Sequence, residues 1–151
     1  MYPITRSYVE LAIKSSIGDL YQHDHHLMAV NSSERSLTHQ LAIHLAKYFP
    51  NHHVDCEYNR NGCDPKMLRL PVCSNVSSDA LDAKTVFPDI VVHDRGNNDN
   101  NLLVIEVKKA SSSESPEHDK DKLRAFKNEL SYQFAFHITL DLQKQKYEEI
   151  N

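Results

Sequence analysis

The strongest constraint on the fold is a pair of apolar segments joined by turn-forming residues. Residues 86–93 (VFPDIVVH) and 102–108 (LLVIEVK) are rich in Val, Ile and Leu, and the β-branched Val and Ile favour strands. The residues between them, DRGNNDNN, are nearly all turn formers. The two segments are therefore predicted to form a β-hairpin. Runs as apolar as these are typical of strands that are buried on both faces of a sheet.

Apolar residues at helical spacing predict three helices. The first covers residues 5–21 with Thr5 as its N-cap, the second begins near Ser33 and ends before Pro50, and the third begins after Ser115-Pro116. Residues 54–58, which alternate in polarity, and residues 132–140 predict two further strands. The resulting order of elements is α-α-β-β-β-α-β.

The remaining segments carry weaker signals. Residues 22–26 are polar and rich in His, and residues 74–84 lack periodicity, so both are expected to be loops. Residues 67–72 are expected to continue a hairpin after a turn at Asn61-Gly62, as an edge strand because of Pro71. The last ten residues are expected to form a short helix or to fray.

Length, charge and cysteine content limit the class of protein. A chain of 151 residues favours one domain, and a formal net charge of -4 argues against binding nucleic acid or membranes through bulk charge. The apolar runs are too short to span a membrane, and the first ten residues lack the apolar stretch of a signal peptide. Cys56, Cys63 and Cys73 form no CxxC motif, which favours reduced thiols. We therefore expect a cytoplasmic protein with no membrane partner.

Two charged residues interrupt the apolar strand 102–108. Period two places Glu106 and Lys108 on one face, with Lys108 about 7 Å further along the strand. A turn centred on Asn97-Asn98 would put Asp89 of the preceding strand opposite Glu106. Two carboxylates that face each other across a ladder repel, and a buried charge needs a partner. A divalent cation between the two carboxylates would offset their repulsion and would be the partner that each buried charge needs. Ligation by oxygen alone suits Mg²⁺ or Mn²⁺ better than zinc.

Asp89, Glu106 and Lys108 together are the groups that phosphodiester hydrolysis needs. A metal ion lowers the pKa of water and shields developing charge, while a lysine orients or neutralises phosphate oxygens. Near a bound metal the pKa of Lys108 is expected to fall, because a neighbouring cation disfavours its charged form.

Pro88-Asp89 followed by Glu106-Val107-Lys108 resembles the PD-(D/E)xK signature of the restriction-endonuclease-like nucleases. The resemblance covers roughly residues 33–140 and agrees with the predicted order of elements. It implies an α+β fold, an α/β sandwich with an αβββαβ core, in which helices flank a mixed central sheet and an extra helix precedes the core. The single domain, 1–151, would then consist of an N-terminal helix and His-rich loop (1–30), the core (31–141) and a C-terminal tail (142–151).

The resemblance also implies roles for individual residues. Asp89 and Glu106 would hold Mg²⁺ or Mn²⁺ with the backbone carbonyl of Val107, and Glu34, on the first core helix, would assist directly or through water. Lys108 would position or activate the nucleophile. The implied function is a nuclease that acts on DNA rather than RNA, as a homodimer or within a larger complex.

Two other functions stay open at this point. The chain could be a nuclease-fold module that binds nucleic acid or a partner protein without cutting, or a nuclease subunit that is active only in a larger complex. In any of these cases, candidate contacts to a nucleic-acid backbone are Arg60, Lys66, Arg69, Lys109 and Lys122.

The candidate site residues also have purely structural interpretations. Asp89 could be a strand-edge residue after Pro88, and Glu106 with Lys108 could form the solvated face of an edge strand. Glu34 could belong to a capping box with Asn31 as the N-cap. The histidines at 23–26 and 52–53 show no ligand spacing typical of zinc, which favours solvated loops.

Overall fold

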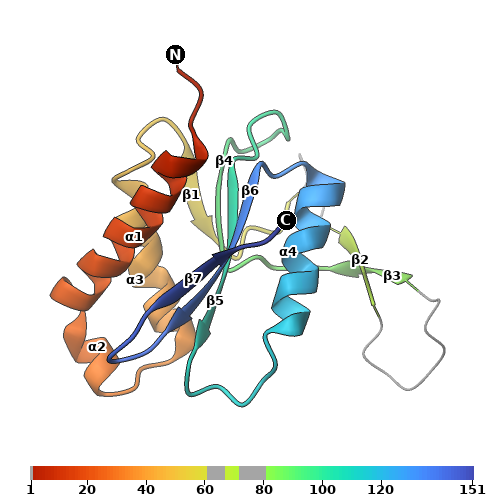
Figure 1. Cartoon of the computed structure of the whole chain (residues 1–151). Helices are drawn as coiled ribbons and strands as arrows, with labels where there is room; N and C mark the ends of the chain where they lie inside the picture. Colours follow the sequence, from red (N-terminus) through yellow and green to blue (C-terminus); the bar gives the residue numbers. More distant parts are fainter. Residues whose placement is uncertain (1, 61–66, 72–80) are drawn as a thin grey trace.

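The computed structural model describes residues 2–60, 67–71 and 81–151, and in it helices cover both faces of a five-stranded sheet (Figure 1). Helices α1 (Arg6–His23), α2 (His25–Ala29) and α3 (Glu34–Ala46) pack on one face and α4 (Glu117–Leu130) on the other. The strands, in sheet order, are β1 (His53–Cys56), β4 (Ile90–His93), β5 (Leu103–Lys109), β6 (Phe134–Leu140) and β7 (Lys146–Glu149). The sheet is mixed, because β5 and β6 are parallel and the other neighbours antiparallel. The predicted α+β class, with helices flanking a mixed sheet, is thus confirmed.

An apolar core lies on each side of the sheet, and the alternation along β5 assigns its side chains to the two cores. Leu103, Ile105 and Val107 pack with the buried faces of α1 and α3. Val104 packs on the opposite side with the apolar stripe of α4. The predicted division of this strand is confirmed, so the face that carries Glu106 is the one that faces α4.

Helix α1 follows its prediction closely, but the His-rich segment does not. Thr5 is the N-cap of α1, and its hydroxyl oxygen accepts a hydrogen bond of 3.2 Å from the Tyr8 N–H. Residues 22–26, predicted to be a loop, form the end of α1 and the start of α2. Asp24 lies between these helices, and its carboxylate lies 2.6 Å from Nε2 of the buried His44 on α3, which ties the junction to the core.

The central hairpin is shorter than predicted on one arm. Strand β4 begins only at Ile90, because Pro88 has no N–H to donate to a ladder. The Pro88 carbonyl oxygen instead accepts the Glu57 N–H at 2.9 Å. Strand β5 covers nearly all of its predicted segment.

Across the described ranges, no helix combines the length and apolar character needed to cross a bilayer.

The strand predicted at residues 67–72 is confirmed, but its pairing differs from the expected one, and two other strands occupy segments predicted to be a loop and a short helix or frayed end. Strand β2 (Met67–Pro71) pairs antiparallel with β3 (Leu81–Thr85) in a separate sheet and not with β1. The alternation in the β3 sequence, LDAKT, is too brief to stand out from the predicted loop. Strand β7 replaces the expected short helix or frayed end, because it completes one edge of the sheet by pairing with β6. The predicted turn at Asn61-Gly62 and residues 74–80 lie outside the described residues.

We expect Ile13→Ala to lower the free energy of unfolding by about 2–5 kcal/mol, because it deletes buried methyl groups and leaves a cavity beside α1. Ile13 is 1% exposed, whereas Ile43 on α3 is 46% exposed. Ile43→Ala is therefore the matched control, with an expected change within about 0.5 kcal/mol. Urea denaturation followed by circular dichroism measures both variants. Equal losses would contradict the place of α1 in the core.

Candidate functional site

The pairing of β4 with β5 brings two carboxylates together. Ile90 lies opposite Ile105, so the same register puts Asp89, one residue before β4, opposite Glu106, as expected from the sequence. Each carboxylate accepts a hydrogen bond from the backbone of the neighbouring segment. Asp89 Oδ2 accepts the Val107 N–H at 2.7 Å, and Glu106 Oε1 accepts the Asp89 N–H at 3.3 Å.

Both carboxyl groups are largely removed from bulk water. Glu106 is 2% exposed, and burial, followed by the charge of Asp89, raises its pKa well above the ordinary value. Burial also raises the pKa of Asp89, against the hydrogen bond from Val107, which lowers it. Because β5 lies between β4 and β6 and Lys108 is buried as well, the interpretation of Glu106 and Lys108 as a solvated edge is wrong.

A lysine on α4 supplies positive charge to this pair of carboxylates. The Lys122 ammonium lies 3.0 Å from Glu106 Oε1 and donates a hydrogen bond of 3.0 Å to the carbonyl oxygen of Phe87. Its charge lowers the pKa of both Glu106 and Asp89, but less than burial raises them. Carboxylate and carbonyl oxygens are also the donors that Mg²⁺ prefers. The donor atoms at this point are therefore chemically suited to a hard divalent cation.

Lys108 lies further along the same face of β5 and is held by acidic side chains. Its ammonium lies 3.2 Å from Asp119 on α4 and 3.4 Å from Glu114. Burial lowers the pKa of Lys108, but the two carboxylates outweigh this effect and the pKa is raised. The expected fall in this pKa concerns the metal-bound protein and stays a prediction. Asp119 also lies 3.5 Å from Nε2 of buried His137 on β6.

Glu34 lies in the first turn of α3 and reaches β5. Its Oε2 accepts a hydrogen bond of 3.0 Å from the backbone N–H of Lys109. Ser33, not Asn31, is the N-cap of α3, and its hydroxyl oxygen accepts a backbone N–H of the first turn at 3.2 Å. The capping-box interpretation of Glu34 is therefore wrong. Glu34 also lies close enough to Asp89 for its charge to contribute to the raised pKa there.

A cleft of about 410 Å³ opens beside Asp89. Its walls come from the start of α3 and from the end of β1, and they consist of Ser33, Glu34, Arg35, Thr38, His39, Cys56, Glu57 and Asp89. Glu57 adopts a φ of 50°, which is uncommon for a residue with a side chain, and its carboxylate binds Arg35 at 3.1 Å. Glu106 is not among the lining residues, so a ligand in the cleft would meet Asp89 first.

The structure thus brings most of the predicted site residues to one end of the β4–β5 pair. Asp89 lies next to Glu106, Glu34 lies near Asp89, and Lys108 follows Glu106 on the face toward α4. Val107 takes part through its N–H, whereas a role for its carbonyl oxygen stays a prediction.

The predicted nucleic-acid contacts are spread over several elements. Arg60 is exposed after β1, Arg69 belongs to β2, and Lys66 lies outside the described residues. The Lys109 ammonium donates to two carbonyl oxygens of the segment before α3, at 3.3 and 2.8 Å. Lys122 is engaged with Glu106. Contact between these residues and a phosphate backbone stays a prediction.

Asp119 is a site residue that is not predicted from the sequence, and Lys122 binds Glu106 although it is predicted to contact nucleic acid. A signal for both is present in α4. Asp119 and Lys122 precede the buried Leu123 and Phe126 by one helical turn each, so they continue the buried stripe of the helix. The signal is weak because other charged residues of both signs are interleaved along the same helix.

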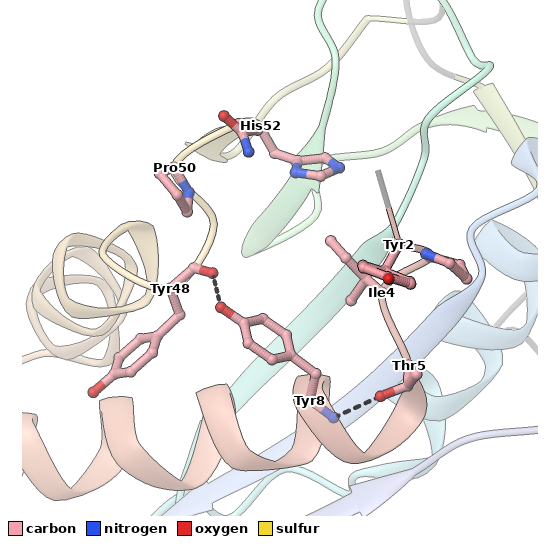
Figure 2. A pocket seen from close by; sticks show the side chains of 9 residues that line it. Tyr2, Ile4, Thr5, Tyr8, Tyr48, Pro50 and His52 are labelled. Atoms are coloured by element: carbon pink, nitrogen blue, oxygen red, sulfur yellow. Dashed lines mark hydrogen bonds between the residues drawn. The ribbon is translucent and has the colours of Figure 1, made fainter.

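Two other features lie apart from this cleft. His23, His25 and His26 are exposed on α1 and α2. Within residues 2–60, 67–71 and 81–151, no three His, Cys, Asp or Glu side chains gather closely enough to form a metal site on their own. A second cavity, of about 350 Å³, lies near the start of α1, where the Tyr8 hydroxyl donates to the Tyr48 carbonyl oxygen (Figure 2). None of the residues that line this second cavity is acidic. The cleft beside Asp89 is therefore the better candidate for metal-dependent chemistry, because it offers carboxylate ligands.

Comparison with known proteins adds little to this geometry. The sequence matches no known family model and no curated protein. Among solved structures, the crystal structure of SSO0001 is similar, with 15% sequence identity and a TM-score of 0.44, covering 99% of this chain and 70% of that chain.

The thiol of Cys56 should report the electrostatics of the cleft. Partial burial, followed by the charges of Asp89, Asp55 and Glu57, raises the pKa of Cys56 to about 11. Compared with the ordinary thiol pKa of 9.0, about 100-fold less thiolate is then present near neutral pH. We therefore expect iodoacetamide to alkylate Cys56 about 100-fold more slowly than free cysteine.

The measurement uses a Cys63→Ser, Cys73→Ser background and mass spectrometry. Adding Asp89→Asn should speed alkylation, because it removes a negative charge next to the thiol, while unfolding in urea should restore the rate of a free thiol. Alkylation of the folded protein at the rate of free cysteine would contradict the predicted electrostatics.

Proposed function

We propose that this chain is a metal-dependent phosphodiester hydrolase that acts on DNA. The observation that carries the proposal is that Asp89 and Glu106 meet at the β4–β5 pair, with Lys108 on the same face of β5 as Glu106. When the separate β2–β3 pair that lies between β1 and β4 in the chain is set aside, the order α3-β1-β4-β5-α4-β6, with parallel β5 and β6, supports it further. That order corresponds to the α-β-β-β-α-β core implied by the resemblance to PD-(D/E)xK nucleases.

In this proposal, Asp89 and Glu106 hold Mg²⁺ or Mn²⁺ with the carbonyl oxygen of Val107, and Glu34 assists directly or through water. The ion would supply a water of lowered pKa and would shield charge on the phosphate. Lys108 binds a phosphate oxygen or positions the attacking water. Its ammonium would have to exchange a carboxylate partner on α4 for the substrate, because it is paired with Asp119 in the free protein.

The cleft supports access of a phosphate group to Asp89. The first turn of α3 lines it with Ser33, Glu34 and Arg35, and the N-terminus of a helix favours anions through its free N–H groups and its dipole. The Arg35 side chain is 83% exposed, so its guanidinium can turn toward a phosphate. Negative charge from Asp89 and Glu34 opposes an anion unless a cation is bound between them.

One observation favours a second candidate function. The buried charges are already paired within the chain, Lys122 with Glu106 and Lys108 with Asp119. A site compensated in this way is stable without a metal ion. This supports a nuclease-fold module that binds nucleic acid or a partner protein without cutting, or a subunit that cuts only in a larger complex or as a homodimer.

We expect Asp89→Ala and Lys108→Ala each to reduce cleavage of plasmid DNA in Mg²⁺ or Mn²⁺ by about 100-fold or more, because each removes a group that acts on the metal or the phosphate. Asp99→Ala and Lys14→Ala are matched controls on exposed residues away from the cleft. Gel electrophoresis of plasmid and of labelled DNA and RNA oligonucleotides measures the rates.

Equal cleavage by the wild type and both site variants would contradict the assignment of the site. Absence of cleavage by the wild type, with Mn²⁺ binding intact, would favour the subunit of a larger complex. Absence of both would favour the module that binds without cutting.

A further inference from the structure

We propose that Lys122 is the resident cation of the candidate site and that it sets how tightly the site binds a divalent metal ion. A metal ion that enters between Asp89 and Glu106 has to displace the Lys122 ammonium. The inference rests on the proposed metal-dependent function and adds to it a residue that controls metal affinity.

The contacts of the Lys122 ammonium are those of a bound cation. It lies 3.0 Å from a carboxylate oxygen of Glu106 and 3.0 Å from the carbonyl oxygen of Phe87. Phe87 lies two residues before Asp89 in the sequence. The ammonium that binds the Phe87 carbonyl oxygen therefore lies near Asp89 as well as Glu106. Hard divalent cations take the same kinds of oxygen donor. An ammonium and a metal ion therefore compete for the same atoms.

Lys122 is fixed in this position by the fold. Its side chain is 14% exposed, unlike a solvated surface lysine, and it belongs to the row of α4 that continues into buried Phe126. Helix α4 connects the parallel strands β5 and β6, so its place over β5 is set at both ends. The ammonium is therefore held at Glu106 without any ligand.

Charge balance favours exchange for a divalent ion. Lys108 is paired with Asp119, so within the described parts of the chain Asp89 and Glu106 share the positive charge of Lys122. One ammonium neutralises only one of the two carboxylates, whereas a divalent cation neutralises both. The resident lysine thus stabilises the metal-free protein and weakens metal binding at the same time.

The test is calorimetric titration of Mn²⁺ into the full chain, for the wild type, Lys122→Gln and the control Lys127→Gln. Lys127 lies on the same helix but donates to the carbonyl oxygen of Ile150, so the control changes net charge equally and leaves the site intact. Lys122→Gln should tighten Mn²⁺ binding by about tenfold or more, and Lys127→Gln should leave the affinity within about twofold of the wild type. Asp89→Asn added to Lys122→Gln should abolish the gain.

Thermal unfolding provides a second readout, because loss of Lys122 leaves the Glu106 carboxylate without its positively charged partner. Lys122→Gln and Lys122→Met should unfold at lower temperature than the wild type without metal, and Mn²⁺ should raise their unfolding temperature more than that of the wild type. This comparison applies even if one variant is only marginally folded.

The outcomes separate the inference from the proposed function. Mn²⁺ binding that is equal in the wild type and Lys122→Gln, together with DNA cleavage, would overturn the inference and leave the proposed function standing. Binding by Lys122→Gln but not by the wild type would support the inference and contradict metal-dependent cleavage by the isolated chain. No binding to either protein would overturn both.

Discussion

The site depends on the cost of a negative charge in the middle of a buried sheet. Glu106 lies on the central strand β5, with helices over both faces, so water cannot solvate its carboxylate. Its partners come from two directions: the Asp89 N–H beside β4 and the Lys122 ammonium from α4. Removing one partner of a buried charge costs more than the pair contributes, because the remaining charge is left uncompensated. The Glu106 carboxylate thus stabilises two features of the fold: the position of α4 over β5 and the backbone conformation at the start of β4.

The central part of the fold could be predicted because its local signals are strong. The apolar alternation of residues 102–108 assigns β5 to the middle of the sheet, and the turn-forming residues before it fix the register that puts Asp89 opposite Glu106. The edge strand β1 could be predicted from its alternating polarity, but β3 and β7 could not, because they are short and carry charged residues. Strands of this kind form where a neighbouring strand offers free backbone groups, and local propensity decides little there.

The candidate site also contains residues that the sequence predicts and residues that it does not. Asp89, Glu106 and Glu34 lie at strand and helix positions that the sequence identifies; Asp89 and Glu34 line the cleft, and Glu106 lies behind Asp89. The partners from α4, Asp119 and Lys122, could not be assigned from the sequence, because which face of a mixed-charge helix is buried depends on how it crosses the sheet. Their effect is large: they pair with Lys108 and Glu106, so the metal-free site is a network of ion pairs rather than a set of free side chains.

Parallel strands such as β5 and β6 require a crossover connection, and α4 is that crossover. Moving the helix away would pull on both strands, whereas the long alkyl stem of a lysine rotates easily about its own bonds. Rotamer changes are far faster than shifts of packed helices. Exchange of the lysine for a metal ion at Glu106 would then leave the backbone of the protein unaltered. The metal-free and metal-bound forms would differ mainly in the direction of one flexible side chain.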